Sequence, residues 1–144
     1  MIRLTKFALA ATLLLALQSC GTTNTASVSA PATIRNARSA HVIKPNDSSR
    51  DIDKFLQRAI SEKGVRTSVM APSQRSNSDL TVTYVDRWHW DMVMYLRTLD
   101  ISVLDPAGNE VATAKYRNSA LHSYPDPETT TKGLVDQIFE KSGR

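Results

Sequence analysis

The sequence predicts an α+β domain in which a mostly antiparallel sheet of about five strands carries two helices packed on one face. Apolar residues alternate at period two along much of the second half of the chain, and two other segments repeat apolar residues at helical spacing. Most of the strands are joined by short turns, which favours antiparallel pairing. The expected order of elements is β-α-β-β-β-β-α, and the alternation indicates that the second face of the sheet is solvated.

The first half of this domain contains one strand, one helix and a second strand. Residues 40–44 form the first predicted strand, which a Pro-Asn-Asp sequence ends. A helix follows, with Asp47 or Ser48 as its N-cap, and Gly64 can adopt the left-handed conformation that ends a helix. Residues 65–70 form the second strand. The helix carries one apolar stripe, made of Ile52, Phe55, Leu56, Ala59 and Ile60.

The second half carries the strongest strand signal. Residues 79–91 alternate at period two, with Asp86 interrupting the apolar side, and residues 92–105 continue the pattern. An Asp-Pro-Ala-Gly-Asn turn at residues 105–109 then predicts a hairpin with a return strand at residues 110–118. One side of the first of these strands holds Leu80, Val82, Tyr84, Trp88 and Trp90. The last helix follows two prolines and carries Leu134, Val135, Ile138 and Phe139.

The N-terminal residues 1–19 have the composition of an export signal. Arg3 and Lys6 form a short basic region, and residues 7–17 form an apolar run of 11 residues. A helix needs about 18 apolar residues to span a bilayer, whereas about 7–15 is the usual length of a signal-peptide core.

The end of this segment resembles the lipobox of bacterial lipoproteins. Leu17, Gln18, Ser19 and Cys20 stand in the order that the motif requires, with a small residue directly before the cysteine. The resemblance implies that a diacylglyceryl group is attached to the Cys20 thiol, that the chain is cut before Cys20, and that the new amino group is acylated, for instance with palmitate. Gly21, where an aspartate would resemble an inner-membrane retention signal, favours the outer membrane. The expected location is the cell envelope, with the chain held at the membrane by Cys20 and facing the periplasm.

Three regions follow from these patterns. Residues 1–19 are the predicted lipoprotein signal peptide, and residues 39–144 are the single α+β domain. Residues 20–38 contain the lipidated Cys20 and a flexible tether, because they are rich in Thr, Ser, Ala and Asn without an amphipathic period; the alternative is that their end adds an edge strand. The pattern of the domain resembles the small α+β domains of periplasmic and outer-membrane lipoproteins, and residues 79–92 are similar to a stretch in a group of uncharacterised bacterial lipoproteins.

Charge and cysteine content exclude several classes of function. The chain has 18 basic and 14 acidic residues, and without residues 1–19 it has 16 against 14, a net charge of +2. These basic residues are scattered, so we expect no nucleic-acid partner. A single cysteine excludes an internal disulfide and a Cys-rich metal centre. The sequence also lacks a glycine-rich phosphate loop and a Gly-x-Ser-x-Gly elbow, and no cofactor or metal is expected.

The most unusual segment is residues 86–91, Asp-Arg-Trp-His-Trp-Asp. Arg and Trp are favoured anchors at interfaces, so the leading hypothesis is a non-enzymatic binding or envelope-assembly accessory protein that contacts an envelope protein through Arg87, Trp88 and Trp90. The simplest structural interpretation is that both Trp rings only cover the core.

Two other functions stay open at this point. One is a small hydrolase or metal-dependent enzyme that uses Asp86, His89 and Asp91, although zinc normally needs three or four ligands in a recognisable spacing. The other is a small-ligand carrier, which requires an apolar cavity between sheet and helices.

Overall fold

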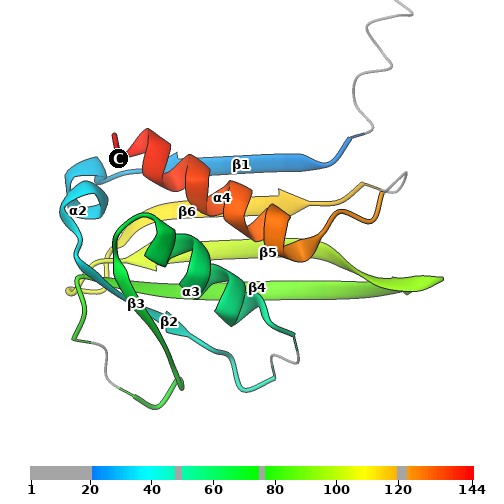
Figure 1. Ribbon diagram of the computed structural model, residues 1–144, viewed down its shortest axis with the longest axis horizontal. Helices are drawn as coiled ribbons and strands as arrows, with labels where there is room; N and C mark the ends of the chain where they lie inside the picture. Colours follow the sequence, from blue (N-terminus) through cyan, green and yellow to red (C-terminus); the bar gives the residue numbers. More distant parts are fainter. Residues whose placement is uncertain (1–20, 48–49, 75–76, 120–122) are drawn as a thin grey trace, which may run out of the picture.

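The computed structural model describes residues 21–47, 50–74, 77–119 and 123–144, so the predicted signal peptide and Cys20 lie outside the described residues. Within them the chain forms one six-stranded sheet and three helices, which confirms the α+β class. The elements are β1 (Thr23–Val28), α2 (Pro31–Asn36), β2 (Ser39–Ile43), α3 (Ile52–Glu62), β3 (Arg66–Met70), β4 (Leu80–Asp91), β5 (Val93–Leu104), β6 (Glu110–Arg117) and α4 (Pro127–Lys141). Figure 1 shows α3 and α4 across one face of the sheet, with α2 at one end. Over the described ranges, no helix has the length and apolar character needed to cross a bilayer.

The sheet is mixed, with the strand order β1-β6-β5-β4-β2-β3. Neighbouring strands in the series β1, β6, β5 and β4 pair antiparallel. β2 is instead parallel to both of its neighbours, β3 and β4. The sheet therefore has one strand more than the predicted number of about five, and it is mostly antiparallel as predicted except for the two parallel pairings of β2. β2 and β3 are parallel because α3 lies between them, and a helical crossover returns the chain to the same end of the sheet.

Residues 23–36, predicted as part of a flexible tether, instead form β1 and α2. β1 is an edge strand that pairs along its whole length with β6, so backbone hydrogen bonds hold a segment whose side chains are mostly polar. Pro31 stands in the first turn of α2, where its missing N–H costs nothing. Ile34 in the same helix is completely buried. The segment therefore belongs to the domain.

The core lies between the sheet and the two long helices, and both predicted helical stripes are confirmed. Helix α3 begins at Ile52 with Asp51 as its N-cap, later than the predicted start at Asp47; Ser48, the other predicted N-cap, lies outside the described residues. Only about 10 Å³ of open space remains between the sheet and these helices, about the minimum that a single water molecule needs. That part of the described chain therefore offers no room for a carried ligand. The buried helical residues are Ile52, Leu56, Ala59, Ile60, Leu134, Val135, Ile138 and Phe139.

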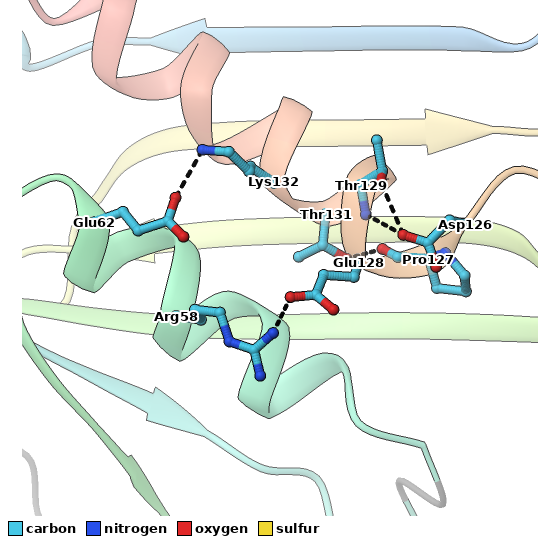
Figure 2. A network of polar contacts seen from close by, with 8 residues as sticks. All are labelled: Arg58, Glu62, Asp126, Pro127, Glu128, Thr129, Thr131 and Lys132. Carbon is cyan, nitrogen blue, oxygen red and sulfur yellow. Dashed lines mark hydrogen bonds and ion pairs between the residues drawn. The ribbon is translucent and has the colours of Figure 1, made fainter.

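Ion pairs join the outer surfaces of α3 and α4 (Figure 2). Arg58 pairs with Glu128, and Lys132 Nζ lies 2.8 Å from Glu62 Oε2. All four side chains are well exposed, and exposed pairs of this kind contribute at most about 1 kcal/mol each. The packing of the apolar stripes, rather than these pairs, therefore holds the two helices together.

Asp126 is the N-cap of α4. Its Oδ2 accepts hydrogen bonds of 2.8 Å from both the backbone N–H and the hydroxyl of Thr129 (Figure 2). These bonds hold the pKa of Asp126 below its ordinary value. Thr131, one turn after Pro127, donates from its hydroxyl to the carbonyl of Pro127 at 2.7 Å. The start of α4 is thus fixed by side-chain hydrogen bonds.

We expect Asp126→Ala to lower the free energy of unfolding by about 1 kcal/mol at neutral pH, because an N-terminal backbone N–H loses its partner. The folded pKa of Asp126 is depressed, so its contribution is full above the unfolded pKa of about 3.9 and disappears as pH falls through the lower folded value. Urea unfolding at neutral and acid pH measures the difference. Glu140→Ala, at an exposed position in the same helix, is the control. If the difference in free energy of unfolding between the wild type and Asp126→Ala did not decrease at acid pH, the role of the carboxylate would be contradicted.

Candidate functional site

The β4–β5 hairpin extends beyond the rest of the sheet (Figure 1). On one side, β2 pairs with β4 only as far as Val82. On the other side, β6 pairs with β5 only from Thr98 onward. Both strands nevertheless continue paired to each other up to Asp91 and Val93. The last part of the hairpin is therefore a two-stranded arm without a neighbouring strand on either side.

The arm ends in a group of exposed apolar side chains. Trp90 is 65% exposed and Met92 is 85% exposed, the largest values among the large apolar residues of the described chain. Trp90 and Met94 are direct cross-strand partners. We refer to the exposed residues Trp90, Met92, Val93, Met94 and Tyr124 as the tip patch.

Met92 forms the turn of the hairpin in a left-handed conformation, with φ of 59°. Among the described residues it is the only non-glycine with positive φ. Asp91 is the only common turn residue here, without the Gly, Asn or Pro that usually accompanies it, and the alternation alone did not locate the turn. An exposed methionine in a strained conformation is costly for folding, which favours a functional reason for its presence.

We expect Met92→Asn to stabilise the fold by about 0.5–1 kcal/mol, because asparagine accepts the left-handed conformation more easily than methionine. Little packing is lost, since the Met92 side chain is almost fully exposed. Thermal or urea unfolding measures the change. Val93→Asn, at the next position in ordinary strand conformation, is the matched control and should give no gain. A destabilised Met92→Asn protein would show that the methionine contributes to folding.

Trp88 and Trp90 lie on the same side of β4 but in different surroundings. Trp88 is half-buried against the core, the Arg50 guanidinium lies 5.0 Å from its ring centre, and its indole N–H donates to Asp86 Oδ2 at 2.5 Å. Covering the core is therefore the role of Trp88, whereas Trp90 projects beyond it. Arg87 is exposed on the opposite side of the strand. The three residues predicted for partner binding thus do not form one surface, and only Trp90 belongs to the tip patch.

A row of aromatic rings supports the arm. His89 and Tyr95 pack edge to face with ring centres 5.8 Å apart, and Tyr95 packs in the same way on Tyr124 at 5.5 Å. The Tyr124 hydroxyl donates to the backbone carbonyl of Asp91 at 3.0 Å. Partial desolvation, with the Asp91 charge, holds the pKa of Tyr124 above its ordinary value, so the phenol stays protonated as the donor. No sequence pattern could place Tyr124 here, because it comes from the segment before α4.

The residues of the enzyme hypothesis are not brought together in one pocket. The Asp86 carboxylate accepts the Trp88 indole N–H and borders a hollow of about 200 Å³ that includes neither His89 nor Asp91. His89 and Asp91 are both exposed. Within the described ranges, no group of three His, Cys, Asp or Glu side chains is placed to hold a metal ion. A hollow of about 360 Å³ at the β2–β3 edge is polar and wide open, and it is lined by Ser39, His41, Arg66, Thr67, Ser68, Asn77 and Ser78.

Comparison with known proteins identifies the fold but no family. No protein-family model matches the sequence, and no curated protein matches it. The structure is similar to a PelC dodecamer from Paraburkholderia phytofirmans, with a TM-score of 0.57 and 12% identity over 84% of this chain and 96% of that one. A single-residue variant of that PelC dodecamer gives a TM-score of 0.56 and 15% identity, with the same coverage. A minor lipoprotein from Acinetobacter baumannii gives a TM-score of 0.37 and 16% identity over 72% of this chain and 90% of that one.

Proposed function

We propose that the chain is a lipid-anchored protein of the cell envelope that works by binding, without catalysis, through the tip patch. The observation that carries the proposal is the two-stranded arm that holds Trp90, Met92, Val93 and Met94 away from the core. Exposed Trp and Met side chains cost solubility, so a cluster of them at the end of an arm marks a contact surface. The lipobox supplies the anchor at Cys20, and Gly21 supports the outer membrane facing the periplasm.

The same structure favours binding over the hydrolase or metal-dependent enzyme. Chemistry at Asp86, His89 and Asp91 requires that the three groups reach one substrate in one pocket. Instead, Asp86 is engaged by the Trp88 indole, while the two other side chains lie on the exposed arm. Binding needs only the accessible tip patch, which is present.

A second copy of the chain is another candidate for what the tip patch contacts. The solved PelC proteins with this fold are dodecamers. The sheet of this chain also ends in two edge strands, β1 and β3, which can pair with a neighbour.

Photo-crosslinking in native membranes tests the contact surface. A photoreactive amino acid at position 92 is expected to form a covalent adduct with the molecule that the tip patch contacts. The same group at position 85 is expected to form none. Val85 is a suitable control because it is 56% exposed on β4 but lies away from the tip. Adducts at twice the mass of the chain would identify a second copy. Equal yields at both positions, or none at position 92, would contradict a contact through the tip patch.

A further inference from the structure

The turn of the β4–β5 hairpin and the start of β1 lie at the same end of the sheet (Figure 1). Thr23 pairs with Arg117, and Arg117 pairs in turn with Thr98 of β5. Thr22, one residue earlier, lies beside Asn118, with its hydroxyl 3.4 Å from Asn118 Oδ1. The N-terminal end of the described domain is thus level with the point where the hairpin arm begins.

Few residues separate the predicted anchor from this point in the sequence. Cys20 directly precedes Gly21, the first residue that the structure describes. Because residues 23–28 form β1, no long tether separates the anchor from the domain. From Thr98 the arm continues for about six residues to Met92, or about 20 Å along the strand direction. A domain anchored at Cys20 therefore has its tip patch within reach of the same bilayer.

The chemistry of the tip patch fits the boundary between lipid head groups and acyl chains. Trp90 and Tyr124 combine an apolar ring with a polar end, the residue types that gather at this boundary. Met92, Val93 and Met94 are purely apolar. Asp91 carries a charge at the same level and keeps the insertion shallow. The Asp91 carbonyl is already bonded by Tyr124, so burying the turn does not leave it unsatisfied.

A second copy fits the tip patch less well than a bilayer does. A stable protein interface uses about 20–30 residues on each side. The tip patch has five exposed apolar residues at the end of a narrow arm. A membrane requires no matching shape and needs only a few inserted side chains, because the lipid on Cys20 would supply the rest of the affinity.

We infer that the tip patch inserts into the surface of the bilayer that holds Cys20, so that the domain is attached at two points and has a fixed orientation. The inference rests on the proposed lipid anchor and names what the tip patch contacts. The C-terminal end of α4 lies at the opposite end of the molecule in Figure 1 and would point away from the membrane.

Fluorescence of the two tryptophans tests the inference, since the chain contains no others. The lipidated protein is purified from membranes and reconstituted into phosphatidylcholine vesicles whose acyl chains are brominated near the head group. Trp88→Phe leaves Trp90 as the only emitter, and Trp90→Phe leaves Trp88. We expect the emission of Trp90 to shift to the blue and to be quenched by bromine, with Trp88 unaffected.

Two further variants separate insertion from folding. The Met92→Asn protein keeps its turn but loses one apolar side chain. In a form that carries no lipid, made by replacing Cys20 with serine and residues 1–19 with a secretory signal that is cleaved without lipidation, it should bind vesicles through the tip about tenfold more weakly than the same form with Met92. Val85→Asn, outside the tip patch, should bind as the wild type does. Unfolding curves of all variants confirm that the fold is intact.

The mass of the N-terminal peptide, measured on the same samples, reports the lipid on Cys20 independently. An acylated Cys20 with Trp90 unquenched would overturn the inference while leaving the anchor in place. Quenching of Trp90 in a protein without acyl chains would support the tip contact while contradicting the anchor. A blue shift without lipid, together with a doubled mass in solution, would assign the tip patch to a second copy and also overturn the inference.

Discussion

Replacing Cys20 by serine is expected to abolish palmitate labelling of the protein completely. Serine has no thiol, so the thioether to the diacylglyceryl group cannot form. Each buried CH₂ group of an acyl chain contributes about 0.8 kcal/mol to membrane attachment, and two chains are needed for stable anchoring. The loss of the anchor is therefore larger than any effect of a substitution within the domain. Labelling of cells with radioactive palmitate, followed by capture of the protein, measures it directly.

The location of the protein in the cell is measured with a second variant. It is needed because the uncut apolar run at residues 7–17 can itself hold the chain at a membrane. With residues 1–19 exchanged for a secretory signal that is cleaved without lipidation, the Cys20→Ser protein should appear in the soluble periplasmic fraction. Ser19→Ala keeps a small residue before the cysteine and should label as the wild type does. Label that persists on the serine variant would show that Cys20 is not the acceptor.

Ile34→Ala is expected to lower the free energy of unfolding by about 2–5 kcal/mol, the cost of emptying a fully buried aliphatic site. Ile34 has 0% exposure and packs into the main core from α2. If residues 20–38 were a flexible tether, the substitution would not change the free energy of unfolding. The variant therefore distinguishes a flexible tether from a folded part of the domain. Urea unfolding followed by circular dichroism gives the value.

Asn36→Ala in the same short helix is the matched control, since Asn36 is exposed. Its effect should stay within about 0.5 kcal/mol, as for most surface substitutions. If Ile34→Ala had an effect as small as that of the control, α2 would not be part of the folded core.

Turn residues and helical apolar stripes in the sequence were enough to predict the elements that contain them. The predicted turn at residues 105–109 is confirmed, with Gly108 at φ of 88° and Asp105 accepting from the backbone N–H of Asn109 at 2.8 Å. The stripes of α3 and α4 are confirmed because each helix buries one continuous face. In these segments, the chain's local chemistry and its tertiary surroundings require the same structure.

Elements stabilised by distant parts of the chain could not be predicted. β1 has a polar sequence and exists because β6 offers a free edge. The parallel pairing of β2 depends on how α3 crosses over, which no side-chain pattern records.

The same reasoning explains the site. The alternation of residues along the strand correctly placed Trp88 and Trp90 on one side of β4. Their different exposure depends on how far the residues that cover this side extend along the strand. Arg50 and the core reach Trp88 and do not reach Trp90.

The pairing of β1 with β6 also sets the order in which the domain can close. The two strands are far apart in the sequence, so β1 can join the sheet only after the chain has been delivered as far as β6. For a chain held by Cys20, this last strand is the one next to the membrane. Until it docks, β6 presents an unpaired edge, and another anchored copy nearby can donate its own β1 instead. Crowding on the membrane would therefore promote strand exchange between neighbours, a route to linked copies that needs no new interface.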